Sequence, residues 1–572
     1  MTLREQWDRR AWPRILLAFA LNAAFLFVML RFFAPQWETN DDLLMSKFVD
    51  GQLSHKTAYV PFVNICLGWF LKTVYTLLGD GFNWYSALQY LLLYLGFTAI
   101  TWTLLRRFRL FPALVMTAVL LGAFGTDCYL SMNFSKPSAL GTVGGMCLML
   151  QALRNGSGRV QKTPLVLGIL MGAAGFCWRF EEFGVCALLM ATVCIPELFA
   201  LRAENRELGV GGRLGRYARY LAPFVLLAVI AVGLHVGNSL AWRRPEIRDY
   251  THFDWTRSEF VDFGSIEYAD LGESYEAVGI DENFAYLIKK WSFYDTEKFT
   301  QENLDKLIEA RRGQVSRRTP GECLGVFLNQ CLMGFTLDRP FAGFAFLLVL
   351  WLACGRRKAG NWLGLGCMAA LFVLVYLYMI YFDRYLANRV DIGFFLAMAV
   401  ALSFQLDPER LRDEKLLLTA VLLLSLFVTY RANRAYCYLD SHNTIEDKSA
   451  EKAAVERLLE DTEHLYFVKV WSIDHQLYSP LETPPTGYAD RLVHIGGWSM
   501  NHPVIEEILD KWGIDNPYRD LADRDDVFLI DHEIWTTIAY LRGNYYPKAS
   551  AELVQPLSNE TGYRIYRIRS GE

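Results

Sequence analysis

Long apolar stretches recur along most of this sequence, and short basic segments separate them. The first apolar stretch runs from Ile15 to Phe33 and follows four arginines. A helix needs about 20 apolar residues to cross the roughly 30 Å of hydrocarbon in a bilayer. We expect further membrane-spanning helices near residues 84–104, 110–126, 138–153, 164–178, 183–200, 220–240, 340–354, 361–382, 390–405 and 416–430. The sequence therefore predicts a polytopic membrane protein with about eleven transmembrane helices.

The composition agrees with a mixture of membrane-embedded and water-facing parts. Hydrophobic residues make up 53% of the 572 positions, charged residues make up 21%, and the mean hydropathy is +0.16. Soluble chains keep more charge for their surfaces, whereas a chain made only of spanning helices would be more apolar. The net charge of -4 comes without a clustered basic excess, which excludes a nucleic-acid-binding protein.

The basic connectors predict how the chain is oriented in the membrane. Beyond the N-terminal arginines, they lie at residues 106–109, 154–162, 202–219, 356–358 and 410–415. Connectors rich in Lys and Arg are expected on the cytoplasmic side of the membrane. All of these connectors lie on that side if the N-terminus is cytoplasmic and if the stretch Tyr59 to Leu78 does not cross the membrane. Pro61, Asn64, Gly68 and Lys72 interrupt that stretch, which favours a re-entrant or juxtamembrane helix at the outer surface.

Three sizeable regions then face outward. They are a first loop (34–83), a middle loop (241–339) and a C-terminal region (431–572) that follows a transmembrane domain of residues 1–430. The C-terminal region alternates strand-like runs, such as 465–470, 527–530 and 563–568, with helical periodicity at 450–459 and 504–512. We therefore expect a mainly α polytopic fold with an extracytoplasmic α/β or α+β domain at its C-terminal end.

The eleven cysteines give no sign of a metal or redox site. Most lie inside predicted spans, and the sequence has no CxxC pattern and no Cys/His ligand spacing. Cys323 and Cys331 lie close together on the outer side. A disulfide between them is one interpretation, and free buried thiols are the favoured one.

The sharpest chemical signal is an acidic pair directly after the first span. Asp41 and Asp42 follow Glu38 on its outer side. Adjacent carboxylates repel each other, so one of them is expected to titrate near neutral pH, as a general base acting on a hydroxyl must. The alternative interpretation is a solvated start of a loop.

Other ionisable residues are expected at the same depth, at the outer ends of separate spans. They are Lys56, Asp127, Lys136, Arg179, Glu181, Glu182, Arg384 and Arg389. Ionisable groups at the edge of the hydrocarbon usually line a cavity or pair with one another. A local salt bridge is the alternative for Arg179 with Glu181 and Glu182, and lipid headgroup contact is the alternative for Arg384 and Arg389.

The order of these features resembles the GT-C superfamily of integral-membrane glycosyltransferases, which includes protein O-mannosyltransferases and lipid A aminoarabinose transferases. The resemblance rests on the acidic pair after one span, Lys56 and Pro61 before the re-entrant segment, and the basic connector at 106–109. The Gly-rich helix 168–179, which ends in a basic residue, and the segment Arg384-Tyr385-Leu386 are similar to family segments. The resemblance covers roughly residues 1–430 by topology.

The resemblance implies an activity and roles for particular residues. Asp41 or Asp42 would be the base that deprotonates an acceptor hydroxyl, in an inverting transfer from a polyprenyl-phosphate sugar. Lys56, Arg179 and Arg384 would hold the donor phosphate. Asp127 would line the same cavity. From their own positions in the sequence, Glu38, Lys136 and Glu182 are further candidate cavity or substrate residues, and Arg257 is the candidate in a middle loop whose other residues are expected to fold over the membrane surface. A divalent metal bridging Glu38, Asp41 and Asp42 is possible, and the metal is left unassigned.

Other functions remain open at this point. The acceptor is a glycan, a lipid or a protein. A transporter or flippase of lipid-linked sugars would need polar residues near the bilayer midplane and paired halves. A polysaccharide polymerase or ligase would instead depend on basic residues of the middle loop, around Arg243, Arg244 and Arg257. The tryptophans 471, 498, 512 and 535 form either a carbohydrate site or, more commonly, domain core, and a non-catalytic scaffold is a further alternative.

Overall fold

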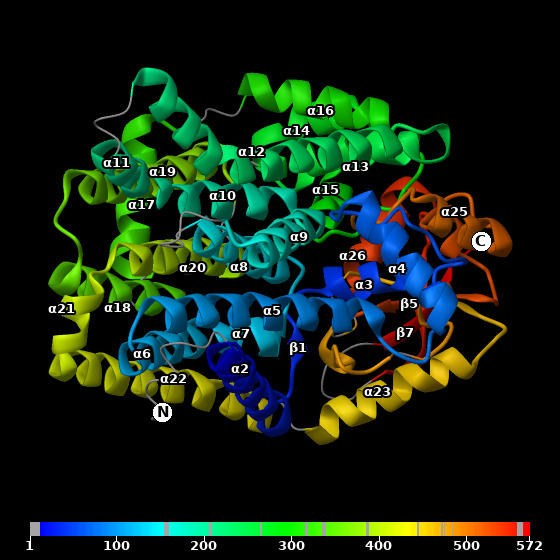
Figure 1. Ribbon diagram of the computed structural model, residues 1–572. Helices are drawn as coiled ribbons and strands as arrows, with labels where there is room; N and C mark the ends of the chain where they lie inside the picture. Colours follow the sequence, from blue (N-terminus) through cyan, green and yellow to red (C-terminus); the bar gives the residue numbers. More distant parts are fainter. Residues whose placement is uncertain are drawn as a thin grey trace.

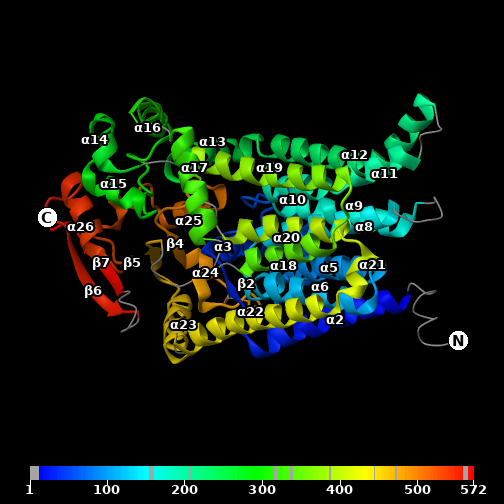
Figure 2. The same cartoon turned by 90° about the vertical axis from the view of Figure 1, so that its left-hand side faces the viewer.

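The structure is a computed structural model of the 572-residue chain. It describes residues 12–153, 160–204, 209–263, 266–314, 318–334, 339–384, 388–442, 445–470, 473, 475–483, 485–557 and 564–571. A bundle of long helices occupies one part of the molecule, and a sheet domain with short helices covers one end of it (Figures 1 and 2). The predicted fold class, mainly α with a C-terminal α/β domain, is confirmed.

The bundle contains the helices that the apolar stretches predict. Within the described ranges, six helical segments are long and apolar enough to cross a membrane. They are α2 (Trp12–Phe32), α5 (Trp84–Arg107), the segment Leu110–Leu130 that begins with α6 (Leu110–Leu120) and ends with α7 (Thr126–Leu130), the segment Phe180–Ala203 with α10 (Phe180–Ala191) and α11 (Cys194–Glu204), α12 (Val210–Ala241) and α19 (Ala359–Tyr381). A π-helical turn, Leu121–Gly125, joins α6 to α7.

The other five predicted spans are also helices, although they are shorter or less apolar. They are α8 (Ser135–Leu153), α9 (Lys162–Trp178), α18 (Arg339–Cys354), α20 (Asn388–Gln405) and α22 (Lys415–His442). Helix α8 is buried along almost its whole length, so its side chains face other helices and need not be strongly apolar. Because α22 continues to His442, the expected domain boundary after residue 430 falls inside a helix.

Glycines allow α8 to approach its neighbours closely. A Cβ atom on Gly145 would lie 2.5 Å from the Gly168 carbonyl oxygen of α9, and one on Gly96 of α5 would lie 2.6 Å from the Leu140 carbonyl oxygen. Small residues at helix interfaces let backbones pack tightly where no hydrophobic effect drives association. The Gly-rich pattern of 168–179 therefore serves helix packing as well as leading to Arg179.

The basic connectors meet at one end of the bundle. Arg107 donates to the Phe404 carbonyl, Arg356 N donates to the Gln405 carbonyl at 3.1 Å, and Gly355 forms a β-bridge with Leu406. Helix α21 (Pro408–Asp413), the last basic connector, lies at the same end, opposite the sheet domain (Figure 2). This arrangement places the described basic connectors together, as the positive-inside rule requires.

The first loop forms β1 (Gln36–Trp37), α3 (Asn40–Asp50) and α4 (Ile65–Leu78). Helix α4 has 14 residues, which is too short to cross the bilayer. Its start is tied to the ends of two spans, since Asn64 N donates to the Cys177 carbonyl at 2.8 Å and Ile65 N donates to Asn238 Oδ1 at 2.8 Å. The interrupted stretch that begins at Tyr59 is therefore a short helix at the bundle end.

The middle loop is helical and packs on the C-terminal domain. Its helices are α13 (Pro245–Val261), α14 (Tyr268–Ala277), α15 (Glu282–Lys289), α16 (Gln301–Gln314) and α17 (Pro320–Asn329). Buried Asp295 joins the two regions by accepting from Asn516 Nδ2 at 3.1 Å, Tyr540 Oη at 2.5 Å and Tyr545 Oη at 2.7 Å. The loop and the domain thus form one body at the end of the bundle.

The C-terminal domain is a five-stranded sheet in the order β4-β3-β5-β7-β6. Its strands are β3 (Leu465–Val468), β4 (Leu492–His494), β5 (Val527–Asp531), β6 (Ser550–Pro556) and β7 (Arg564–Arg569), and its main helices are α23 (Ile445–Glu460), α25 (Pro503–Trp512) and α26 (Ile534–Asn544). Strands β4, β3 and β5 are parallel, whereas β7 pairs antiparallel with β5 and β6. The predicted strands near 465, 527 and 563 and the helices near 450 and 504 are confirmed.

The described cysteines are free, including Cys323 and Cys331. Cys323 is buried as the favoured interpretation expects, whereas Cys331 is half-buried.

Candidate active site

Two short strands bring the first loop against the end of the third predicted span. Strand β1 pairs in parallel with β2 (Ser131–Met132), so that Trp37 lies opposite Met132. Glu38 N then donates to the Met132 carbonyl at 2.9 Å. This pairing places the acidic segment after β1 beside the polar segment after β2.

Asp42 is buried and fully bonded. Its Oδ1 accepts from Tyr85 Oη and Gln89 Nε2, both at 2.8 Å, and its Oδ2 accepts from Asn133 Nδ2 at 3.1 Å and Phe134 N at 3.3 Å. Burial raises the pKa of Asp42 to about 7, although the hydrogen bonds from Gln89, Tyr85 and Phe134 N act in the opposite direction. This carboxyl holds the first loop to α5 and to the segment after β2.

Asp41 has the more open environment of the two. It is half-buried, and each oxygen has one donor: Thr39 Oγ1 to Oδ2 at 3.0 Å and Trp498 Nε1 to Oδ1 at 2.9 Å. A carboxylate has about four lone-pair sites, so Asp41 retains the capacity to accept from another hydroxyl. The sequence left the choice between the two aspartates open, and the two expected features of a base fall on different residues. The pKa raised toward neutral belongs to buried Asp42, whereas the carboxylate with capacity for another donor is that of Asp41.

Glu38 and Lys136 form an ion pair beside this acidic segment. Lys136 Nζ lies 2.8 Å from Glu38 Oε2, and it also donates to the backbone carbonyls of Asp127 and Ser131. Lys136 is 1% exposed. The structure therefore brings Glu38, Lys136 and the Asp127 backbone together, with the ammonium facing the first loop.

Arg179 lies between α9 and α10 and turns toward the same segment. Its guanidinium lies 5.1 Å from the centroid of the Phe134 ring, and its Nη1 donates to Ser135 Oγ at 2.5 Å. The Arg179 carbonyl accepts from Ser138 Oγ at 2.8 Å, which ties the break between the helices to α8. The nearby carboxylate of Glu181 lies 3.8 Å from Arg179 Nε.

A cavity of about 620 Å³ opens beside Arg179. Its walls come from the segment before α4, from the junction of α9 and α10, from the end of α12 and from α13. The lining includes the basic side chains of Arg179, Arg243 and His235. It also includes the carboxylates of Glu181 and Asp254. The cavity therefore combines cations with aromatic walls at the end of the bundle that bears the acidic pair.

Arg243 was not among the predicted donor-phosphate residues. It is exposed, it lines the cavity, and it makes no ion pair with the residues that the structure describes. Its position directly after the span ending near residue 240 was the available signal, because a cation there is expected at the membrane surface.

Two aromatic rings in contact connect the wall of the cavity to Asp41, which does not itself line the cavity. Phe62 lines the cavity, and its ring meets the Trp498 indole edge to face at a centroid distance of 5.2 Å. On its other side, Phe62 stacks on Phe134 at 6.0 Å. Phe62 has φ 68° and is 44% exposed, a backbone conformation that is uncommon for a bulky residue.

Two predicted cations have partners elsewhere. Lys56 Nζ pairs with Asp80 at 2.6 Å and donates to the Tyr75 carbonyl at 3.3 Å. Arg384 lies 4.4 Å from the ring centroid of Phe263, near the end of α13. Tyr385 and Leu386, the rest of that motif, lie outside the described residues.

Arg257 and Glu182 point into protein rather than into the cavity. Arg257 is 1% exposed and pairs with Asp254 at 2.8 Å and Asp262 at 3.1 Å, so its guanidinium holds α13 together. Glu182 is 2% exposed and faces α20, where a Cβ atom on Gly393 would lie 1.6 Å from Glu182 Oε1. Neither side chain lines the cavity of Arg179.

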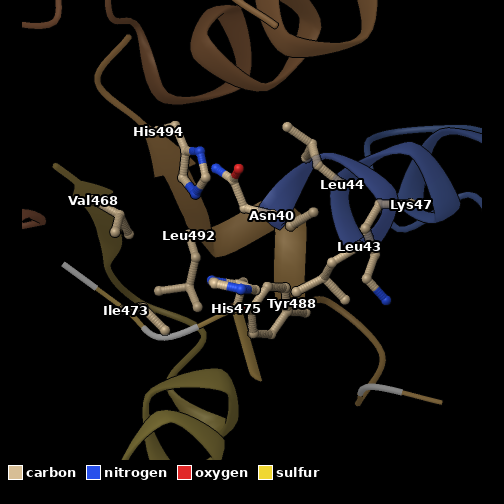
Figure 3. A pocket seen from close by; sticks show the side chains of 11 residues that line it. Asn40, Leu43, Leu44, Lys47, Val468, Ile473, His475, Tyr488, Leu492 and His494 are labelled. Atoms are coloured by element: carbon tan, nitrogen blue, oxygen red, sulfur yellow. The ribbon is translucent and has the colours of Figure 1, made fainter. Parts of the chain in front are cut away.

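A smaller cavity of about 40 Å³ marks the contact of α3 with the C-terminal domain. Figure 3 shows Asn40, Leu43 and Leu44 of α3 facing Leu492 and His494 of β4 across it. Burial lowers the pKa of His494 to about 4, so this ring is neutral at physiological pH. Helix α3, which carries both aspartates, is therefore seated on the sheet.

No group of three or more Asp, Glu, His and Cys side chains in the described ranges is arranged to hold a metal ion. Glu38 is paired with Lys136, and the oxygens of Asp42 are occupied by protein donors. Glu38, Asp41 and Asp42 therefore each bond to separate protein partners and do not form such a group.

Comparison with known proteins gives one structural likeness. No protein-family model matches the chain, and no curated protein sequence matches it. Among solved structures, the fold is similar to the crystal structure of ArnT from Cupriavidus metallidurans in the apo state. The sequence identity is 12%, the match covers 96% of this chain and 97% of that chain, and the TM-score is 0.42.

Proposed function

We propose that this protein is a membrane glycosyltransferase of the GT-C type. It transfers a sugar from a polyprenyl-phosphate donor to an acceptor hydroxyl at the outer face of the cytoplasmic membrane, with Asp41 as the general base. The observation that carries the proposal is the convergence of Asp41, the Glu38–Lys136 pair and Arg179 at one end of the bundle, next to a cavity of about 620 Å³.

The donor phosphate is assigned to Arg179 and Arg243. Both line the cavity, from the α9–α10 junction and from the segment after α12. Guanidinium groups bind phosphate in a planar, bidentate geometry and remain charged at any physiological pH. Lys56 and Arg384, the other predicted phosphate ligands, contact Asp80 and Phe263 instead, and the proposal does not need them.

The lipid part of the donor is assigned to the outside of α12. Val232, Val236 and Leu240 are at least half exposed on this apolar helix, and the end of the same helix forms a wall of the cavity. An isoprenoid chain lying along α12 would leave its phosphate at the level of Arg243. Binding from the bilayer fixes the orientation of the donor before reaction.

The reaction is a single inverting displacement. The acceptor oxygen forms a bond to the anomeric carbon while Asp41 takes its proton. The bond from that carbon to the phosphate oxygen breaks, and its electron pair leaves with polyprenyl phosphate. Arg179 and Arg243 stabilise the charge on the departing phosphate. Asp41 does not line the cavity, so the sugar must extend from the cavity past Phe62, which lines it and contacts Trp498.

The polymerase or ligase alternative depends on basic residues of the middle loop, around Arg243, Arg244 and Arg257. Arg243 lines the cavity and would serve either function, so the variant that separates the two functions is at Arg257. Its guanidinium is buried and bonded to Asp254 and Asp262, which favours a role in holding α13. A transporter of lipid-linked sugars would bind the same donor, and only product formation separates it from a transferase.

The test is transfer measured on purified protein in detergent. Synthetic polyprenyl-phosphate hexoses and pentoses are supplied with a membrane extract as acceptor, and release of polyprenyl phosphate is followed. We expect release with wild type and none with Asp41→Asn, while Arg257→Lys stays active if it folds. Release by Asp41→Asn at the wild-type rate would exclude Asp41 as the base, and loss confined to Arg257→Lys would favour the polymerase or ligase class.

A further inference from the structure

The C-terminal domain contributes a side chain, Trp498, that contacts Asp41 of the first loop. Trp498 follows β4 and a turn in which Gly496 and Gly497 have φ of 154° and 87°. A Cβ atom on Gly496 would lie 2.2 Å from the Trp291 carbonyl oxygen of the middle loop. The turn therefore needs glycine, and its contact with the middle loop fixes the direction in which Trp498 leaves the sheet.

The indole of Trp498 is held on several sides. It stacks on Phe48 of α3 at a centroid distance of 5.8 Å and meets Phe62 edge to face at 5.2 Å. The Trp498 carbonyl accepts from Tyr250 Oη of α13 at 2.9 Å. Trp498 is 7% exposed, so its ring has little freedom to turn.

Its one polar side-chain atom points at Asp41. Trp498 Nε1 donates to Asp41 Oδ1 at 2.9 Å, while Thr39 Oγ1 donates to Oδ2 at 3.0 Å. An indole N–H is a donor only, so it fixes the carboxylate without competing for a proton. A rigid ring is a better positioning group than a flexible chain, because little rotamer entropy is lost when the bond forms.

We propose that Trp498 is a positioning residue for the catalytic base, so that the C-terminal domain is part of the transferase site and not an independent module. This inference rests on the proposed function. Trp498 holds Asp41 Oδ1 with its remaining lone pair directed toward the acceptor hydroxyl, and its edge contact with Phe62 links that geometry to the cavity wall. It does not touch the donor phosphate, so it acts on turnover and not on donor binding.

The test compares two substitutions that each delete one hydrogen bond donated by an aromatic side chain of this domain. Trp498→Phe keeps a ring and removes the N–H to Asp41. Tyr518→Phe, the control, removes the hydroxyl that donates to the Ser292 carbonyl at 2.8 Å, from a ring that is likewise buried. We expect Trp498→Phe to lower kcat by about 10- to 100-fold with donor KM unchanged within about 2-fold. Tyr518→Phe should keep the wild-type kcat.

A second variant covers poor folding of Trp498→Phe. Incorporation of β-(3-benzothienyl)alanine at position 498 keeps the bicyclic shape and replaces only the N–H. It should show the same loss of kcat with the unfolding temperature of wild type. Wild-type kcat in this variant would overturn the inference.

The outcomes separate this inference from the proposed function. Asp41→Asn is assayed in parallel, with undecaprenyl phosphate binding measured for every variant by thermal shift. An inactive Asp41→Asn together with a fully active benzothienyl variant would leave the function standing and remove the role of Trp498. Activity in Asp41→Asn would exclude Asp41 as the base and would therefore contradict the proposed function. A loss of undecaprenyl phosphate binding in the Trp498 variants would also contradict a positioning role.

Discussion

Asp41 and Asp42 are neighbours in the chain, yet their carboxyl groups lie in opposite environments. Asp42 is 0% exposed and accepts from donors on α5 and on the segment after β2, whereas Asp41 is half-buried and bonded to Thr39 and to Trp498. On a helix, adjacent residues point about 100° apart, so one can face the protein while the next faces an opening. Under the proposed function, Asp42 therefore serves the stability of the fold and Asp41 serves as the base.

Replacing Asp42 by Asn should therefore weaken the fold. Each oxygen of Asp42 accepts from two donors, so the amide group faces donors whichever way it turns. Unsatisfied buried donors cost about 1–3 kcal/mol. We expect a clear fall in unfolding temperature for Asp42→Asn and little change for Asp41→Asn, measured by differential scanning fluorimetry in detergent. Equal unfolding temperatures in the two variants would contradict this division.

Donor affinity should depend on the two cavity arginines. Arg179→Ala and Arg243→Ala each remove a guanidinium that lines the cavity, and a charged hydrogen bond contributes about 1.5–3 kcal/mol. We expect the donor KM to rise by about 10- to 100-fold in each variant. Arg244→Ala is the matched control, since Arg244 is the next residue, is exposed and does not line the cavity. A similar rise in the control would show that the effect is one of general surface charge.

The close contact of α8 with α9 should not tolerate a methyl group. A Cβ atom on Gly145 meets backbone atoms of Gly168 at 2.5 Å and Gly172 at 2.8 Å, so the helices must separate. Overpacking of this kind costs about 1–3 kcal/mol. We expect Gly145→Ala to lower the unfolding temperature, whereas Gly366→Ala in α19, with nothing within 4 Å, should leave it unchanged or raise it.

His502 should make the contact between the C-terminal domain and the first loop sensitive to acid. Its Nδ1 accepts from Val504 N and its Nε2 donates to the Tyr59 carbonyl, within 4.7 Å of the ring centroids of Phe48 and Tyr250. Burial lowers the pKa of His502 to about 3, from 6.5. A lowered pKa means that the unfolded chain binds the proton first, so this stabilisation is complete above pH 6.5 and is lost as the pH falls toward 3.

The stability difference between wild type and His502→Asn should therefore shrink in acid. Asn keeps the acceptor for Val504 N at the start of α25 but does not titrate. We expect the difference to fall by up to about 1.4 kcal/mol per pH unit between pH 6.5 and 4. The measurement is the unfolding temperature of both proteins across that range. A constant difference would show that His502 is not held neutral.

The orientation predicted from the basic connectors can be tested by labelling. Lys358 is exposed at the connector end of the bundle, and Trp535 is 66% exposed on the sheet domain. In a chain with exposed Cys66 changed to Ser, we expect a membrane-impermeant maleimide to label Trp535→Cys in intact cells. Lys358→Cys should react only after the cells are opened. The reverse pattern would place the sheet domain in the cytoplasm.

The sequence by itself determined the parts of this protein that depend on local physics. Burial of an apolar stretch in lipid is a sum over neighbouring residues, so the helices of the bundle could be found from hydropathy. The periodicity of residues 504–512 likewise predicted α25. The two-residue strands β1 and β2 were not predicted, because so short a run carries no periodic signal.

Only the tertiary structure decided which polar residues meet. Trp498 lies 457 positions from Asp41, and nothing near either residue in the chain indicates their hydrogen bond. The sequence around Arg257 was consistent with a substrate-binding residue, yet the packing of α13 buries its guanidinium between Asp254 and Asp262. A side chain's exposure and partners are set by elements distant in sequence. The chain alone therefore predicted an acidic outer loop. The fold then gave the two aspartates different partners, because Asp42 contacts α5 and Asp41 contacts the C-terminal domain.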